Sequence, residues 1–93
     1  MREIRQTSAF KRDLKREAKG QHREFLAKHF AALVETLAKD EPVGIQHRDH
    51  PLVGEWKDHR DCHVRPDLVL IYRKPDNSTL QLVRLGSHAE LSL

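Results

Sequence analysis

The chain has 93 residues, enough for one domain and too few for a second hydrophobic core. Charged residues make up 33%, and 17 Lys and Arg against 14 Asp and Glu, with seven His besides, favour an anionic partner such as nucleic acid. No apolar stretch is long enough to span a membrane, no secretory signal is recognisable, and the single Cys62 excludes an internal disulfide. We therefore expect one cytoplasmic domain over residues 1–93.

The N-terminal half is predicted to form a strand and two helices. Residues 2–7 alternate weakly around β-branched side chains and predict a short strand. Ser8 is the expected N-cap of a helix over 8–19, which Gly20 would terminate. A second helix is predicted over 22–39, where apolar residues recur at helical spacing. Its apolar face is wide enough to cover a sheet.

The C-terminal half is predicted to be a three-strand meander. Pro42 ends the helical half, and a polar loop runs from there to Gly54. Strands are expected over 55–64, 68–72 and 79–85, and the continuous apolar run of the second indicates a central strand buried on both faces. The order β-α-α-β-β-β predicts an α+β fold in which two N-terminal helices pack on a mainly antiparallel four-stranded sheet. The other face of the sheet is expected to be free for a ligand.

Histidines and acidic residues gather in this half of the chain. On the predicted strand, alternation places Lys57, His59, Asp61 and His63 on one face. Metal-free RNA cleavage needs a base for the 2′-hydroxyl proton, cations or donors for the phosphate, and an acid for the departing 5′-oxygen. Residues of all three types are present here. The same residues also fit an ordinary ionic surface, so this pattern alone leaves both interpretations open.

Two single features have alternative interpretations as well. Trp56 could stack on a base or pack against a neighbouring element. A metal site could be built on His59 and His63, but their spacing suits a helix rather than a strand and no pair of cysteines supports it. Further ligands for such a site would be Cys62, His47 or His50. We expect no metal ion and no cofactor.

Two segments carry a resemblance to a known family. The sequence from Asp49 to Tyr72, DHPLVGEWKDHRDCHVRPDLVLIY, and the sequence from Arg84 to Leu91, RLGSHAEL, resemble the signature regions of the YafQ branch of the RelE/ParE toxin superfamily. The resemblance implies a RelE-like fold and a bacterial type II toxin. Such a toxin is an mRNA interferase, a ribosome-dependent endoribonuclease that cleaves translated mRNA in the A site without metal and so inhibits translation.

The resemblance also implies partners. They are a cognate antitoxin, the 70S ribosome with its mRNA, and operator DNA reached through the antitoxin complex, without a membrane. We expect the antitoxin to contribute an acidic, partly disordered segment that orders as it wraps the helices or covers the cleft.

The family's active positions match catalytic candidates His50, His63, Asp67 and His88, with Asp61 and Arg84 as nearby supports. We add Lys57 as a phosphate contact and Trp56 as a candidate for substrate stacking. His88 is expected to protonate the 5′-oxygen, while Asp67 or His50 removes the 2′-hydroxyl proton. Two positions depart from the family: Leu68 stands where Trp is common, and no aromatic residue occurs near Ser92.

Two other functions compete with this one. A ParE-like protein shares the fold but inhibits DNA gyrase by binding, has no nuclease activity and does not need the His and Asp set. A non-toxic interaction module, whose histidines are incidental or bind zinc, is the second alternative.

Overall fold

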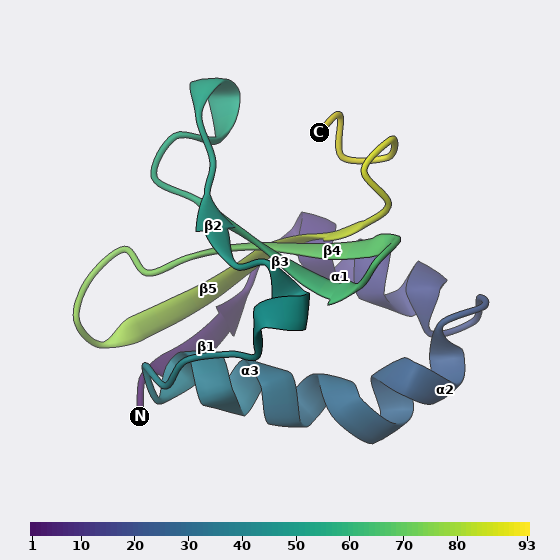
Figure 1. The fold of residues 1–93 in the computed structure, drawn as a ribbon, viewed down its shortest axis with the longest axis horizontal. Helices are drawn as coiled ribbons and strands as arrows, with labels where there is room; N and C mark the ends of the chain where they lie inside the picture. The colour runs from purple at the N-terminus through teal and green to yellow at the C-terminus, as the bar shows by residue number, and fades with distance from the viewer.

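The computed structural model describes residues 1–93 and shows an α+β fold (Figure 1). Its sheet has five strands in the order β1-β5-β4-β3-β2. Only β1 and β5 run parallel, and the other neighbours are antiparallel. The predicted class is therefore confirmed, with one strand more than the four expected. None of the helices is long and apolar enough to cross a membrane.

The N-terminal strand β1 (Glu3–Gln6) leads directly into helix α1 (Ser8–Glu17). The N-cap is Thr7, so the prediction of Ser8 was wrong by one residue. Thr7 has the extended backbone that an N-cap requires, and its Oγ1 accepts a hydrogen bond from the Phe10 amide at 3.0 Å. The same hydroxyl donates to the Val83 carbonyl at 2.7 Å, which fixes the start of α1 against the sheet.

The predicted second helix is one helical segment made of three parts. It consists of α2 (Arg23–Phe25), a π-helical turn η1 (Leu26–Phe30) and α3 (Ala31–Ala38). Its apolar stripe packs with Phe10 of α1 against one face of the sheet, in a core that includes Leu70 and Leu80. The two helical segments touch where the rings of Phe10 and Phe30 stack at 6.1 Å.

The three predicted strands of the meander are all present. They are β3 (Arg60–Arg65), β4 (Leu68–Arg73) and β5 (Thr79–Gly86). The first five residues of β4 are buried, as predicted for a central strand. The remaining strand, β2 (His50–Pro51), was missed because two residues carry no alternation. Pro51 is compatible with it because β2 lies at the edge of the sheet.

Strand β3 begins at Arg60, five residues later than the 55–64 prediction. The preceding residues form a 3₁₀ turn η3 (Gly54–Trp56) and a loop, in which Gly54 and Asp58 have φ values of 70°. Backbone in this region cannot continue a strand. Lys57 and His59 therefore lie outside β3, and the prediction that they share its face with Asp61 and His63 was wrong.

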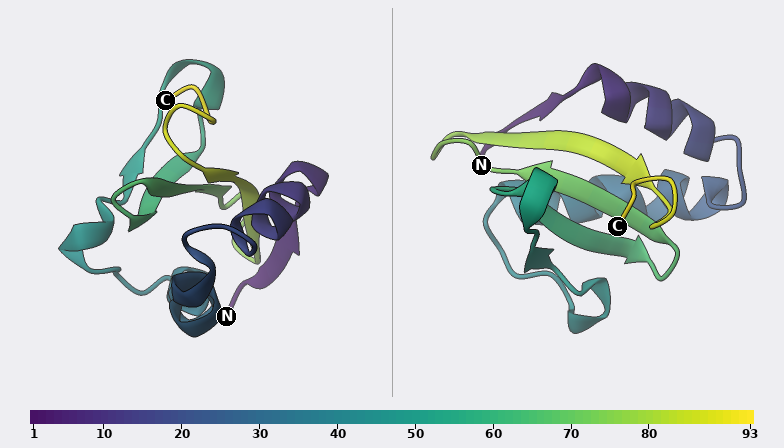
Figure 2. Two further views of the ribbon diagram at one scale, coloured as in Figure 1. Left: turned by 90° about the vertical axis from the view of Figure 1, so that its right-hand side faces the viewer. Right: turned by 90° about the horizontal axis from the view of Figure 1, so that it is seen from above.

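The face of the sheet away from the helices is partly covered, whereas we expected it to be free. Val69 and Ile71 on this face are packed under Leu91, with Leu52 and Trp56 beside them. In Figure 1 the loop after β2 and the C-terminal segment both project from this side of the sheet, and Figure 2 shows the C-terminal segment turning back over the strands. The site described below lies between these two segments.

Candidate active site

Sheet pairing brings four of the predicted site residues together. Asp61 and His63 are two residues apart on β3, so both side chains lie on the face away from the helices. His50 on β2 is paired directly opposite Asp61. On β4, the residue paired with His63 is also paired with the last residue of β5. The chain that continues from β5 therefore carries His88 onto the same face.

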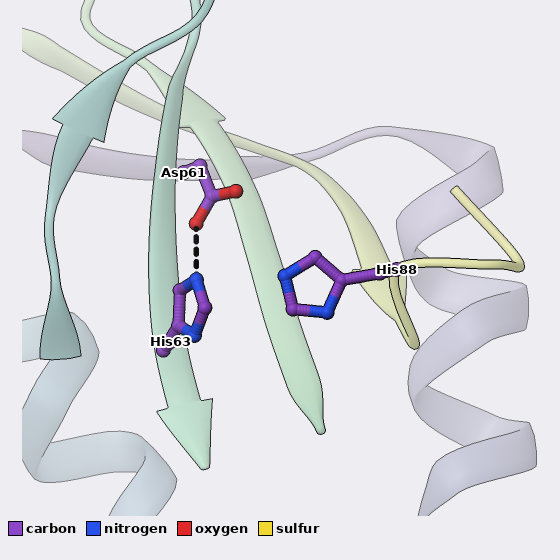
Figure 3. A group of neighbouring side chains, drawn as sticks. All are labelled: Asp61, His63 and His88. Atoms are coloured by element: carbon purple, nitrogen blue, oxygen red, sulfur yellow. Dashed lines mark ion pairs between the residues drawn. The ribbon is translucent and has the colours of Figure 1, made fainter. Parts of the chain in front are cut away.

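The imidazoles surround the Asp61 carboxylate at short range. His63 Nε2 lies 3.3 Å from Asp61 Oδ1, and His50 Nε2 lies 3.9 Å from Asp61 Oδ2. The His63 ring is 5.0 Å from the His88 ring and 6.4 Å from the His50 ring, measured between centroids. Figure 3 shows His88 reaching from the C-terminal segment toward the Asp61–His63 pair. The cluster therefore combines one carboxylate with three groups that can each donate or accept a proton.

Asp61 is the electrostatic centre of this cluster. Its side chain is 4% exposed, and its Oδ1 atom has no hydrogen-bond partner. A buried carboxylate oxygen without a donor is costly, and such atoms in native proteins commonly have a functional explanation. An imidazole N–H of the cluster turned toward Oδ1 would supply the missing partner.

The pKa of His63 is set by opposing influences. Burial lowers its pKa below the usual 6.5, and positive charge on Arg48, His88 or His50 acts in the same direction, while Asp61 raises it. The net pKa lies below the usual value, so His63 is neutral at neutral pH. A neutral imidazole can donate from one nitrogen and accept at the other.

His50 has a defined tautomer when it is neutral. Its Nδ1 lies 2.6 Å from the Arg48 carbonyl oxygen, which can only accept, so Nδ1 carries the proton and donates it. The lone pair is then on Nε2, the atom that faces Asp61. Arg48 has a φ of 45°, a left-handed conformation that turns its carbonyl toward the His50 ring.

A cavity of about 510 Å³ opens over this cluster. Its polar wall is formed by His50, Asp61, His63 and His88, and its other walls come from the segment 52–56 and from Ser92 and Leu93. Trp56 packs on the sheet and also borders the cavity, so its packing is confirmed, and stacking on a base stays a prediction. The wall formed by Leu52 and Val53 was not predicted, although two apolar residues in an otherwise polar loop were a signal for it.

Three predicted site residues lie outside this cavity. Asp67 is in the turn between β3 and β4, 61% exposed, with its carboxylate 3.4 Å from Gln21 Nε2 and 3.4 Å from His22 Nε2. Arg84 donates from Nε to Asp13 Oδ2 at 2.6 Å, and Lys57 is exposed after η3. The contribution of these three residues to substrate binding or catalysis stays a prediction.

The cluster also has the composition of a metal site. Asp61, His63 and His88 each offer one ligand atom, and these atoms lie within 4.8 Å of one another. A carboxylate and two imidazoles suit first-row transition metals. Of the ligands weighed from sequence spacing, only His63 belongs to this set. Cys62 is buried in the helix-side core, where burial raises its pKa to about 12, and His47 Nδ1 is bonded to the His63 carbonyl at 2.6 Å.

Comparison with known sequences identifies a matching family and several relatives. The family described as "Bacterial toxin of type II toxin-antitoxin system, YafQ" matches residues 2–93. The "Putative toxin YafQ" of Haemophilus influenzae is 36% identical over 87 residues, which is 90% of this chain and 85% of that protein. The "mRNA interferase toxin YafQ" of Escherichia coli K12 is 48% identical over 50 residues, which is 54% of this chain and 53% of that protein.

Solved structures agree with this assignment. YafQ from E. coli BL21(DE3) superposes with a TM-score of 0.80 at 33% identity, covering 98% of both chains. A copper-bound mutant toxin from Helicobacter pylori gives a TM-score of 0.83 at 38% identity, covering 98% of this chain and 99% of that one. The toxin chain matched in the E. coli DinJ–YafQ complex gives 0.77 at 32% identity, covering 98% of both chains.

Proposed function

Because this chain belongs to the YafQ toxin family of bacterial type II toxin–antitoxin systems, we propose that it is an mRNA interferase, an endoribonuclease that cleaves translated mRNA in the ribosomal A site. The observation that carries the proposal is the cluster of three histidines around the buried carboxylate of Asp61, at the bottom of a cavity. The description of the E. coli relative as an mRNA interferase toxin supports the reaction class.

His50 is suited to be the general base. Its Nδ1 proton is engaged by the Arg48 carbonyl, so Nε2 can take the 2′-hydroxyl proton. The imidazolium that forms would carry its new proton on the atom that is 3.9 Å from Asp61 Oδ2, where the carboxylate stabilises it. The 2′-oxygen then attacks the adjacent phosphorus. Asp67, the other candidate base, is directed toward Gln21 and His22 instead.

His88 is suited to be the general acid. It reaches the cavity from the opposite side to His50, with His63 between them. A proton from His88 to the 5′-oxygen accompanies the breaking of the phosphorus–oxygen bond, which leaves a 2′,3′-cyclic phosphate and a 5′-hydroxyl end. His63, neutral and next to Asp61, can donate a hydrogen bond to the phosphate as charge develops there.

The test is a cell-free bacterial translation reaction in which mRNA 5′ ends are mapped by primer extension. We expect cuts on translated message, phased to codons, and none on naked message. His88→Ala should abolish the cuts, and His29→Gln, which changes an exposed histidine of η1, should leave them unchanged. Intact message in the wild-type reaction would refute the nuclease proposal and make inhibition of gyrase supercoiling the next assay.

We propose a cognate antitoxin as the partner in the cell, as in the DinJ–YafQ complex of the E. coli relative. The exposed face of α1 carries Lys11, Arg12 and Lys15, and Lys19 follows the helix. This basic surface suits an acidic antitoxin segment. Expression of the toxin alone should arrest growth, and coexpression of the antitoxin encoded beside it should restore growth. A culture that grows normally while making folded toxin would contradict this.

A second property is favoured by the ligand geometry. We propose that Asp61, His63 and His88 bind a transition metal ion, as the copper-bound relative from H. pylori suggests. The orphaned Asp61 Oδ1 would gain a partner, and the ion would occupy one nitrogen of His88, the proposed acid. The ion would therefore inhibit cleavage. Calorimetric titration with Cu²⁺ should show one site that is lost in His63→Gln, whereas a chelator should not reduce cleavage by the metal-free protein.

A further inference from the structure

We propose that Arg16 and Glu90 are positioning residues for His88, acting through a clamp between α1 and the C-terminal turn. Neither side chain lines the cavity. The inference rests on the proposed role of His88 in cleavage, and it concerns how the chain holds that imidazole against His63.

The turn that carries His88 is closed by a reciprocal pair of hydrogen bonds. The Ser87 amide donates to Glu90 Oε1 at 2.9 Å, and the Glu90 amide donates to Ser87 Oγ at 3.1 Å. This is a capping box, in which the residues three apart satisfy each other's backbone donors. The turn continues with the Leu91 amide bonded to the Ser87 carbonyl at 3.1 Å. His88 is thus enclosed between the two members of the pair.

Arg16 ties this turn to helix α1 on both sides of His88. Its Nη2 donates to the Leu85 carbonyl at 2.9 Å, three residues before His88, and its Nε lies 3.4 Å from Glu90 Oε2, two residues after it. The guanidinium is itself held within α1, because Nη1 donates to Asp13 at 3.1 Å and Nε to Glu17 at 2.8 Å. One planar cation therefore fixes the two ends of the segment that carries the imidazole.

Gly86 provides the space for this clamp. A Cβ atom on Gly86 would lie 3.1 Å from Arg16 Nη2 and 3.2 Å from Glu90 Oε1, closer than most side-chain contacts. Its φ is not positive, so the requirement here is room rather than backbone conformation. The roles in the sequence Gly-Ser-His-Ala-Glu are distinct. The glycine leaves room for the Arg16 guanidinium, and the serine and glutamate close the turn through their hydrogen bonds. The histidine between them faces the cavity.

Loosening the clamp should reduce the rate of the chemical step more than it weakens substrate binding. The ring centroids of His88 and His63 are 5.0 Å apart. In the proposed reaction, His88 must keep this position for the His88 proton to reach the substrate. Misplacement of a catalytic group by about 1 Å can cost on the order of 100-fold in rate. Since Arg16 and Glu90 lie outside the cavity, they contribute to the position of the acid and not to contacts with the message.

The test is single-turnover cleavage of ribosome-bound mRNA over a range of toxin concentrations. Glu90→Ala and Arg16→Gln should lower the maximal rate by roughly 10- to 100-fold with a half-saturating concentration unchanged within about 3-fold. Ser87→Ala should resemble them, and Ser87→Thr, which keeps the hydroxyl, should restore the rate. Glu24→Gln and Lys28→Gln remove exposed charges of the same signs as Glu90 and Arg16 and serve as matched controls.

A readout independent of activity separates this inference from the proposed function. Ring-to-ring nuclear Overhauser effects between His63 and His88 should be seen in the wild type and lost in Glu90→Ala. If Glu90→Ala fails to fold, Glu90→Gln still accepts from the Ser87 amide and lacks only the ion pair. If the wild-type protein does not cleave mRNA, the nuclease proposal is refuted. The contacts between the His63 and His88 rings then still test the clamp. Unchanged ring contacts and unchanged rates in the variants would overturn the clamp.

Discussion

Replacing Asp13 with Asn should destabilise the fold strongly, because this carboxylate joins α1 to β5. Asp13 accepts hydrogen bonds from Arg84 Nε at 2.6 Å, Arg16 Nη1 at 3.1 Å and the Leu85 amide at 3.0 Å. Burial raises the pKa of Asp13, but the hydrogen bonds from Arg84 and Leu85 and the charges of both arginines outweigh it. The net pKa lies below the usual 3.8, so the ionised form is the one that the fold stabilises.

The magnitude follows from the burial of each partner. Removing one member of a fully buried ion pair costs about 3 to 5 kcal/mol. Here the Arg84 and Arg16 side chains are 30% and 44% exposed, so water screens the cations that Asn would leave unpaired. Asn also keeps one acceptor oxygen. We therefore expect a loss of about 2 to 3 kcal/mol in the free energy of unfolding, against a total of about 5 to 14 kcal/mol for a domain of this size.

The assay is urea unfolding of both proteins at neutral and at acid pH. Because the folded pKa is depressed, the contribution of Asp13 is present above pH 3.8 and is lost as the pH falls through the folded pKa. The difference between wild type and Asp13→Asn should therefore shrink in acid. Asp58→Asn is the control, since this exposed residue has a φ of 70° that Asn tolerates. Equal urea midpoints for wild type and Asp13→Asn at neutral pH would refute the reasoning.

Three further predictions concern single residues. Cys62, with its pKa raised to about 12 by burial, should react with Ellman's reagent only after denaturation, and rapid labelling of the folded protein would contradict its burial. Leu80→Ala should cost about 2 to 5 kcal/mol in urea unfolding, because Leu80 is fully buried under the helices, whereas exposed Ile4→Ala should cost far less. Trp56→Leu should weaken binding of an oligoribonucleotide by about 1 to 3 kcal/mol if the indole stacks on a base. In the wild type, quenching of the single tryptophan fluorescence reports that binding directly, and an equally tight complex with Trp56→Leu would contradict stacking.

The fold was largely predictable because its long elements have strong periodic patterns. The stripe of the second helix and the apolar run of β4 each bury a continuous surface, and both were located within two residues. The start of β3 was not located correctly, because the alternation of polar residues over 55–59 resembles a strand. The positive φ values at Gly54 and Asp58, which are incompatible with a strand, depend on the loop as a whole. Strand β2 exists only through its pairing with β3, a long-range contact that no local pattern shows.

The site was predictable in composition and only partly in geometry. Strand alternation correctly placed Asp61 beside His63, and the sheet order then brought in His50 and His88. Asp67 was grouped with them because it matches an active position of the family, but the turn directs its carboxylate toward the connection between the two helices. The capping spacing of Ser87 and Glu90 was visible in the sequence, whereas the ion pair of Glu90 with Arg16 required the packing of α1 on β5.

The two departures from the family pattern have different structural consequences. Leu68 is fully buried in the helix-side core and does not line the cavity. Ser92, in contrast, borders the cavity, where an aromatic residue would add a stacking surface. With neither aromatic residue present, Trp56 is the only large aromatic ring beside the histidines, and it belongs to the loop between β2 and β3. A preference for particular bases in this protein should therefore depend on that loop more than on β2 and β3, which hold His50 and His63.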